Sequence, residues 1–413
     1  MYPRFVKKRI ERALSDTRVV LLSGPRQSGK TTLALDISTG TRQYLTMDND
    51  ITRRLAIEDP IGLIRGLNRV TIDEIQKAPA LLSAIKQSVD FDPVPGKFLL
   101  TGSTNFMATP DLPDSLAGRI EIIPILPISQ AEIIGKPSTF IDDAFAGQVP
   151  QAKHVMFGDE LIETVLSGGY PEPLGRKEWV RKQDWYSNYL DSLIERDLRD
   201  LGRLDQVSIM PKLISVLAEY SGQLVNYSNV GKAIGLNHVS AKKYIQVLER
   251  LYLVKLLHPW FKNRLKRQIK SPKLQFLDSG LLATIRKASL HNIQKDKSSF
   301  GPILETFVYS EIMKISTWSE QRCSFYHYRD KDRNEVDFVI ENQNGEIVGI
   351  EVKSSATVSP KDFSGLKKLR EACGDKFMQG LILFDHDQGT PIPYKESFYA
   401  VPISVLWNTS PVS

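Results

Sequence analysis

The sequence has few cysteines, no long apolar run and no strong excess of one charge. Cys323 and Cys373 are its two cysteines and lie far apart, which excludes a disulfide framework or a zinc module built on cysteine pairs. Such sparse use of cysteine fits a reducing cytoplasm. The N-terminal segment is too charged for a signal peptide, and no stretch approaches about 18 apolar residues, so we expect neither a spanning helix nor a membrane partner.

Charge and composition set only broad limits. Lys and Arg number 54 against 48 Asp and Glu, and the net charge of +6 is too small to indicate a partner unless the basic residues are clustered. Hydrophobic residues make up 41% of the chain, which excludes a disordered protein. A chain of 413 residues has the length of about three domains.

The chain divides into three regions by pattern. In residues 1–130, short apolar runs alternate with helix-like segments, which predicts a parallel sheet with crossover helices. Residues 131–290 are largely helical, and residues 291–413 return to strands. We therefore predict an α/β protein with a helical middle domain. The expected strands are 18–23, 44–47, 69–73, 97–101 and 120–123 in the first region, and 325–328, 335–340, 347–352 and 380–384 in the last.

Residues 24–31 match the pattern G-x-x-x-x-G-K-[ST], with an apolar run before them and a helix-like segment after them. The glycines let backbone N–H groups turn inward around phosphates at a helix N-terminus. Lys30 would reach the β- and γ-phosphates of ATP, and the Thr31 hydroxyl would bind Mg²⁺. The predicted nucleotide-binding residues are Gly24, Pro25, Arg26, Gln27, Ser28, Gly29, Lys30, Thr31 and Thr32.

A pair of carboxylates, Asp73 and Glu74, ends the apolar run that starts at Arg69. Ligands of open α/β sheets bind at the carboxyl ends of the strands, so we expect Asp73 to hold Mg²⁺ and Glu74 to act as the general base on water. An additional strand, 44–47, comes between the phosphate loop and this pair. Together with the paired carboxylates, that strand favours an ATP hydrolase over a small-molecule kinase.

Two further polar positions are candidates for catalysis. Asn105 and Ser103 follow the run 97–101 and could bind the γ-phosphate or the attacking water, although an ordinary turn fits equally well. Arg119 precedes the run 120–123 and could stabilise charge in the transition state, in cis or from a neighbouring subunit of a homo-oligomer. A plain surface arginine is the alternative.

The motifs GPRQSGKTT, TIDEIQKAP, LLTGSTN, LAGRIEIIPILPIS and GGYPEPL (168–174) occur in this order. They resemble a family of bacterial and archaeal AAA-type P-loop ATPases that carry a C-terminal uncharacterised domain, and residues 189–201 are similar to a segment typical of it. The resemblance spans nearly the whole chain and implies an AAA-type core and ATPase activity. It does not explain Glu195-Arg196-Asp197, which by itself is a helix face of alternating charge.

The middle domain contains a predicted winged helix-turn-helix at about 205–280. Ser228 is the expected cap of its first helix and Gly235 the expected stop, while Lys242 and Lys243 lie near the start of the second helix. Between 255 and 277 there are seven basic residues and no acid, at 255, 262, 264, 266, 267, 270 and 273. A basic wing of this kind favours DNA as a partner, although winged helices also serve as lids and dimer contacts.

Three acidic residues and a lysine stand out in the predicted helices and strands of the last region. Glu305 lies in a helical stretch, Asp337 in one strand, and Glu351 with Lys353 on one face of the next strand. This set resembles the D…E-x-K nuclease superfamily, which implies Mg²⁺ bound by Glu305, Asp337 and Glu351, with Lys353 orienting water or stabilising charge. Two alternatives stay open: outward-facing Glu and Lys pairs of a strand, or a binding domain without cleavage.

The leading hypothesis is a Mg²⁺-dependent ATPase that acts on DNA through the winged helix and the nuclease-like domain. The alternative is a non-catalytic regulator, in which ATP binding gates a protein or DNA partner. The sequence does not distinguish DNA from RNA.

Overall fold

The computed structural model describes residues 2–103, 116–197, 207–263, 265, 267 and 270–410. The chain forms two compact units. Unit 1 is Met1–Ile128 with Arg250–Tyr252, and unit 2 is Ser129–Glu249 with Leu253–Ser413. Within the described residues, every helix is too short or too polar to cross a membrane.

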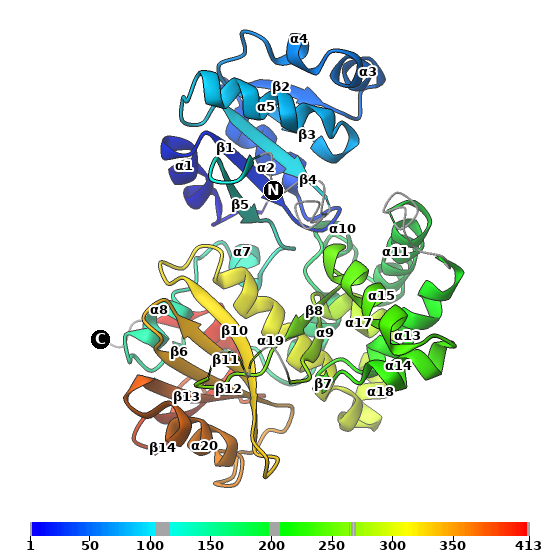
Figure 1. Ribbon diagram of the computed structural model, residues 1–413. Helices are drawn as coiled ribbons and strands as arrows, with labels where there is room; N and C mark the ends of the chain where they lie inside the picture. The colour runs from blue at the N-terminus through cyan, green and yellow to red at the C-terminus, as the bar shows by residue number, and fades with distance from the viewer. Residues whose placement is uncertain are drawn as a thin grey trace. The chain divides into compact units, whose positions relative to one another are not determined.

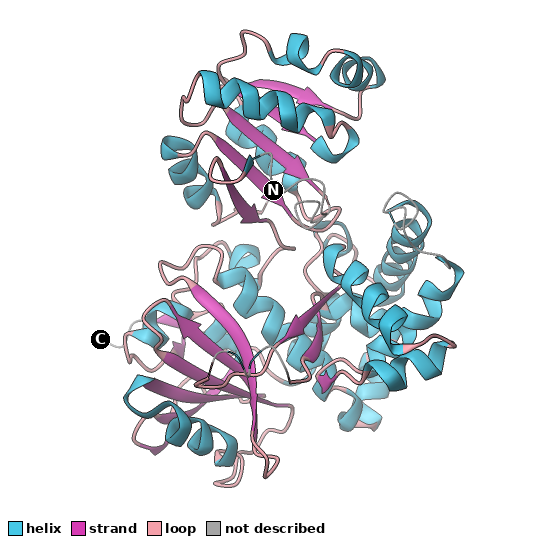
Figure 2. Cartoon of the chain, in the orientation of Figure 1, coloured by secondary structure: helices cyan, strands magenta, loops and turns pink. Residues whose placement is uncertain are grey.

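Unit 1 is built on a five-stranded parallel sheet whose strand order is β2-β3-β4-β1-β5 (Figures 1 and 2). All five strands expected from the sequence are confirmed, as β1 Val19–Ser23, β2 Gln43–Thr46, β3 Val70–Asp73, β4 Phe98–Gly102 and β5 Ile120–Pro124. The helices of this unit are α1 Lys7–Asp16, α2 Lys30–Ser38, α3 Asp50–Glu58, α4 Pro60–Ile64 and α5 Ala80–Phe91. The sheet therefore has crossover helices, as the alternating pattern predicts.

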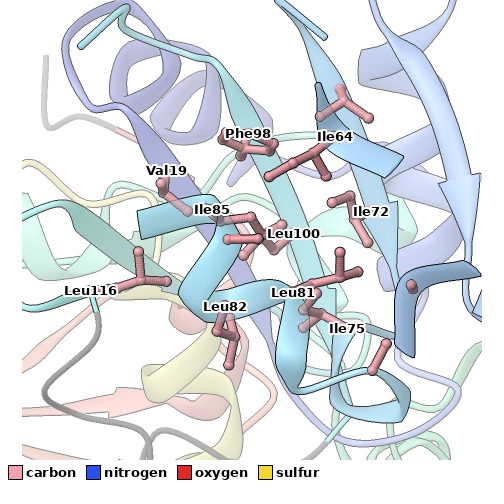
Figure 3. Packing of buried hydrophobic residues seen from close by; sticks show 14 of the residues in the cluster. Val19, Ile64, Ile72, Ile75, Leu81, Leu82, Ile85, Phe98, Leu100 and Leu116 are labelled. Carbon is pink, nitrogen blue, oxygen red and sulfur yellow. The ribbon is translucent and has the colours of Figure 1, made fainter. Parts of the chain in front are cut away.

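One hydrophobic cluster of unit 1 lies between the sheet and α5, and another lies between the sheet and the helices α1 and α2. Apolar residues recur along α5 at helical spacing and pack with buried residues of β3 and β4 (Figure 3). Ile85, Leu100 and Phe98 are fully buried in this cluster. Since each such side chain contributes roughly 1.5–3 kcal/mol, this packing holds the sheet, and hence the ends of its strands, in place.

The sheet order corrects one sequence interpretation. We expected the strand at 44–47 to separate the phosphate loop from the Asp73-Glu74 pair, but β2 lies at the edge of the sheet and β4 lies between β1 and β3. The strand inserted between β1 and β3 is therefore β4, which comes later in the chain than the strand we expected there. The carboxyl ends of β1, β4 and β3 consequently lie side by side at one end of the sheet.

The first part of unit 2 is helical with a small antiparallel sheet of order β7-β9-β8. Its strands are β7 Gln223–Leu224, β8 Val254–Leu257 and β9 Lys273–Phe276. Its helices are α7 Gln130–Ile134, α8 Phe140–Phe145, α9 Gly158–Ser167, α10 Pro171–Leu174, α11 Trp179–Ser192, α13 Met210–Glu219, α14 Tyr227–Ile234, α15 His238–Arg250, α17 Ser279–Ile285 and α18 Leu290–Lys295.

The first helix of the predicted helix-turn-helix is α14. Gly235 ends it with φ of 77°, as expected. The expected cap at Ser228 is wrong: the Asn226 side chain accepts hydrogen bonds from the backbone N–H groups of Ser228 and Asn229, at 3.1 Å each. Asn226 has the extended backbone that an N-cap requires, whereas Ser228 already lies inside the helix.

The motif at 168–174 is a structural junction. Gly168 has φ of 66°, and a Cβ there would lie 2.3 Å from Tyr186 Oη and 2.4 Å from Asp278 Oδ1. Asp278 accepts a 2.8 Å hydrogen bond from the N–H of Gly169. Only glycine fits this close approach of α9, α11 and α17, so packing explains Gly168 of the motif.

The C-terminal part of unit 2 is a six-stranded mixed sheet of order β10-β11-β12-β13-β15-β14. Phe338 and Val339 are neighbours on β11 and point to opposite faces. Phe338 stacks on Tyr309 of α19, and Val339 belongs to the cluster of α20, so the two helices cover opposite faces. The elements are α19 Gly301–Ile315, β10 Cys323–Arg329, β11 Glu335–Asn342, β12 Ile347–Lys353, α20 Ser364–Cys373, β13 Phe377–Phe384, β14 Ile392–Lys395 and β15 Phe398–Pro402.

A segment from the start of unit 2 completes this C-terminal sheet region. The short strand β6 (Gln151–Ala152) pairs with β16 (Thr409–Ser410), and Gln379 Nε2 donates a 2.8 Å hydrogen bond to the carbonyl of Ala144. Trp318 Nε1 donates to the carbonyl of Ser138 at 3.1 Å. Residues 138–152 therefore pack against residues 318–410 within unit 2, although the two segments are far apart in sequence.

Candidate functional site

The phosphate loop leads from β1 into α2 in unit 1. Gly24 follows β1, and a Cβ at this position would lie 2.1 Å from the carbonyl oxygen of Ile125, so the close approach of the residue after β5 requires glycine. Lys30 is buried, and its Nζ donates to the carbonyls of Gly24 at 3.0 Å and Pro25 at 2.7 Å. The ammonium thus lies within the loop, where it can meet the phosphates of a nucleotide.

Thr31 and Asp73 meet beside this loop. The Thr31 hydroxyl donates to both carboxylate oxygens of Asp73, at 3.1 and 3.2 Å, and Thr101 Oγ1 donates to Asp73 Oδ1 at 2.6 Å. Asp73 is buried at the carboxyl end of β3. A hydroxyl and a carboxylate are hard oxygen ligands of the kind that Mg²⁺ takes beside nucleotide phosphates. These two residues therefore fit the magnesium ion that the motif implies.

Glu74 occupies an unusual backbone position. Its φ is 57° and ψ is 46°, the left-handed region, at a cost of about 1–3 kcal/mol for a residue other than glycine. The Glu74 N–H donates to Thr101 Oγ1 at 3.0 Å. The sharp turn places the Glu74 carboxylate beyond the end of β3, next to the buried Asp73.

Gln76 holds the Glu74 carboxylate, and the sequence interpretation missed it. Its amide Nε2 donates both to Glu74 Oε2 and, at 2.8 Å, to Ser103 Oγ. Ser103, one of the two polar candidates after β4, is thus brought next to the site. The nearest sequence signal is the position of Gln76 two residues after the carboxylate pair. The other candidate, Asn105, lies outside the described residues.

Two more residues support the site without a sequence signal. The Arg4 guanidinium donates to the carbonyl of Ser28 at 2.8 Å and to that of Leu126 at 2.7 Å, which fixes the phosphate loop to the chain after β5. Tyr44 on β2 contacts Asp73, and burial together with that carboxylate raises the pKa of its hydroxyl. Both residues act across long separations in sequence, which a local pattern does not reveal.

Arg119 lies at the amino-terminal end of the parallel strands, whereas the phosphate loop lies at their carboxyl end. It directly precedes β5, and β5 runs parallel to β1 with Ile120 beside Val19 and Pro124 beside Ser23. Each of these two strands has five residues at ~3.3 Å per residue, so the two ends of the sheet are roughly 16 Å apart. Arg119 instead pairs with Asp90 of α5, Nη2 to Oδ2 at 3.1 Å. This placement does not support a role for Arg119 at the phosphates of its own subunit. That Arg119 stabilises transition-state charge in a neighbouring subunit stays a prediction.

The basic run at 255–277 is not a continuous exposed stripe. Arg267 is buried and pairs with Glu341 at 2.5 Å, and Lys273 is buried as well. Lys255, Lys262 and Lys270 are exposed, while Arg264 and Lys266 lie outside the described residues. Lys242 and Lys243 near the start of α15 are exposed. Counting charges along the sequence overestimated the surface charge because two of the seven are paired inside unit 2.

The C-terminal candidate residues do come together. The register that pairs Phe338 with Ile350 sets Asp337 beside Glu351, and the Asp337 N–H donates to Glu351 Oε2 at 3.3 Å. Lys353 Nζ donates to Glu351 Oε1 at 3.0 Å. Glu305 of α19 joins them through Lys273, whose Nζ lies 2.7 Å from Glu305 Oε1 and 2.8 Å from Asp337 Oδ1.

Two of these carboxylates, Glu305 and Glu351, have raised pKa values. Burial is the main cause and the negative charge of Asp337 the second, and together they raise the pKa of Glu305 to about 7 and that of Glu351 to about 8. Burial opposes the charge on Lys273, but Asp337, Glu305 and Glu335 outweigh it and raise the pKa of its ammonium. Among the described residues, no group of three or more His, Cys, Asp or Glu side chains is arranged to hold a metal ion. The predicted Mg²⁺ site at Glu305, Asp337 and Glu351 does not fit this arrangement.

Comparison with families supports the assignment of unit 1. Residues 16–134 match the model of a family described as AAA domain. Residues 158–292 and 300–406 match two families, each described as a domain of unknown function (DUF8612 and DUF4143). Residues 16–134 are thus similar to an AAA domain, and the phosphate loop and parallel sheet of unit 1 agree with a P-loop ATPase fold, which supports ATP binding and hydrolysis.

The chain is also similar to individual proteins. Uncharacterized proteins of Mycobacterium bovis and Mycobacterium tuberculosis are each 27% identical over 411 residues, which cover 98% of this chain and 84% of theirs. An uncharacterized protein of Haemophilus influenzae is 24% identical over 344 residues, 80% of this chain and 76% of its own. Among solved structures, the Walker-type ATPase PABY2304 of Pyrococcus abyssi aligns at 16% identity and a TM-score of 0.43, over 69% of this chain and 96% of that one.

Proposed function

We propose that the protein is a Mg²⁺-dependent ATPase in which Glu74 is the general base. The observation that carries this proposal is the convergence of Lys30, Thr31 and the Asp73-Glu74 pair at one edge of the sheet, with Thr31 bonded to Asp73. Magnesium, when bound, would neutralise developing phosphate charge. Residues 24–29 bind the phosphates through backbone N–H groups, as in other phosphate loops.

The protein groups then have separate tasks. The Lys30 ammonium offsets the charge of the β- and γ-phosphates, and Thr31 with Asp73 supplies the oxygen ligands for Mg²⁺. Glu74 accepts the proton of the attacking water, and Gln76 keeps its carboxylate in one orientation. Arg119 of a neighbouring subunit would supply positive charge in the transition state.

The direct test is ATP turnover by the full chain with Mg²⁺ and with EDTA, compared with the Lys30→Ala variant. We expect turnover that depends on Mg²⁺ and is lost in the variant, because the charge opposite the phosphates is gone. Turnover that persists in EDTA or in Lys30→Ala would assign the activity to another site or a contaminant.

We also propose that unit 2 contacts DNA through α15. The supporting observation is that Lys242 and Lys243 are both exposed near the start of this helix, which follows α14 and a glycine turn and precedes the β8-β9 pair. A helix presented in this way is typical of winged helix-turn-helix domains, whose second helix meets base edges and phosphates.

DNA should then stimulate ATP turnover. The assay compares the ATPase rate of the full chain with double-stranded DNA, single-stranded DNA and no nucleic acid, at several salt concentrations. Stimulation that fades as salt rises supports an ATPase acting on DNA. Tight ATP binding with no turnover, with or without DNA, would instead favour the alternative of an ATP-gated regulatory protein.

A further inference from the structure

The D…E-x-K resemblance implies a divalent metal between Glu305 and Asp337, and the structure has the ammonium of Lys273 there. Lys273 Nζ lies 2.7 Å from Glu305 Oε1, 2.8 Å from Asp337 Oδ1 and 3.4 Å from Glu335 Oε1. An ammonium has three donors and no acceptor, so three surrounding carboxylates match its bonding capacity. The side chain is 1% exposed, and lysine is almost never buried this deeply unless it is paired.

Oxygens of Asp337 and Glu351 also have partners within the chain. Asp337 Oδ2 accepts a 2.9 Å hydrogen bond from the Val352 N–H. Glu351 accepts from Lys353 at 3.0 Å through Oε1 and from the Asp337 N–H at 3.3 Å through Oε2. A magnesium ion would need oxygen ligands at about 2.0–2.1 Å, in the space that the ammonium occupies. The cation position is therefore already filled from within the chain.

Lys273 is also held by its backbone. It begins β9, the central strand of the small sheet, with Leu257 opposite it on β8 and Leu224 opposite it on β7. All four residues of β9 are buried. Removing the ammonium from the acids by moving the strand would break hydrogen bonds on both sides of β9. The geometry thus favours an ion pair that stays in place over one that opens and closes.

We propose that Lys273 is the internal counter-cation of this site in place of a divalent metal. Glu305 and Asp337 then form ion pairs with Lys273 that connect the small sheet of the middle region to α19 and β11. The C-terminal domain accordingly does not cleave nucleic acid at this site.

The first test uses the natural sequence and therefore does not depend on how a Lys273 variant folds. Mn²⁺ bound to the nucleotide-free full chain is measured by electron paramagnetic resonance for the wild type and for Asp337→Asn. We expect the same number of bound ions in both, because the wild type holds no metal at Asp337. A wild type that binds one more Mn²⁺ than Asp337→Asn would overturn the proposal.

The second test removes the ammonium. Lys273→Met keeps the length of the side chain but leaves the acids without their cation, so this variant should gain one Mn²⁺ per chain. The double variant Lys273→Met/Asp337→Asn should lose that ion again. Lys255→Met, an exposed lysine on the neighbouring strand β8, is the matched control and should gain none. Absence of the gain in a folded Lys273→Met variant would contradict the proposal.

The third test addresses cleavage. Wild-type protein is incubated with single-stranded and double-stranded DNA in Mn²⁺, over a range of ATP concentrations, beside Asp337→Asn and Glu351→Ala. We expect no nicking that depends on either acid. Nicking by the wild type that both variants abolish would show a metal-dependent nuclease and sink the proposal, while the ATPase assignment in unit 1 would be unaffected.

Discussion

Thr31 and Asp73, which lie 42 positions apart in the chain, are joined by hydrogen bonds of 3.1 and 3.2 Å at the edge of the sheet in unit 1. The contact links the end of the phosphate loop to the end of β3. It exists because β4 lies between β1 and β3 and brings all three carboxyl ends together. The magnesium ligands of the proposed ATPase are therefore positioned by strand order rather than by their proximity in sequence.

Replacing Gln76 should slow hydrolysis without weakening ATP binding. Gln76→Leu keeps the size of the side chain but removes the donor to Glu74 and Ser103. A hydrogen bond to a charged group is worth about 1.5–3 kcal/mol, so kcat should fall roughly 10- to 100-fold with little change in KM. Steady-state kinetics measures both, with the exposed Gln87→Leu as the control. A fall in affinity with an unchanged kcat would show that Gln76 does not position the base.

Neutralising α15 should weaken DNA binding in a salt-dependent way. Replacing both Lys242 and Lys243 with Gln removes two phosphate contacts, so the slope of log affinity against log salt should become shallower by about 2. Fluorescence anisotropy with labelled duplex DNA gives the slope. Lys331→Gln/Lys361→Gln removes the same charge from exposed positions of the C-terminal domain and should leave the slope as it was. Equal slopes for all three proteins would argue against α15 as the DNA contact.

The stability of unit 2 should fall in acid because of His327. Burial, together with the positive charges of Lys273, Arg329 and His258, lowers the pKa of this imidazole to about 3 from its ordinary 6.5. Below pH 6.5 the unfolded chain takes up a proton at His327 that the folded chain does not. Stability attributable to this residue is therefore intact above pH 6.5, and it decreases by up to about 1.4 kcal/mol per pH unit on the way down to about 3.

Urea unfolding of the wild type and of His327→Leu at several pH values isolates this effect, since other groups titrate alike in both proteins. We expect the difference in unfolding free energy between the two to shift in favour of the variant as pH falls. The exposed His291→Leu serves as the control. A difference that does not vary between pH 7 and 4 would mean that His327 titrates alike in the folded and unfolded chains.

Much of unit 1 could be predicted from sequence because its signals are local. The phosphate loop, the Asp73-Glu74 pair and five short apolar runs each occupy a few consecutive residues. The roles of Gln76 and Lys273 could not be found in this way. Gln76 depends on Ser103, 27 positions later, and Lys273 depends on Asp337, 64 positions later. The basic run misled for the same reason, because Lys273 and Arg267 meet acids that only the folded chain brings near.

The central claim is that Glu74 is the base of an ATP-hydrolysing site, and the most direct test is single-turnover hydrolysis by Glu74→Gln alongside measured ATP affinity. The amide keeps the shape of the side chain and loses the proton acceptor. We expect ATP to bind as it does to the wild type, while hydrolysis slows by about 10²-fold or more. Hydrolysis by Glu74→Gln at the wild-type rate would contradict the account.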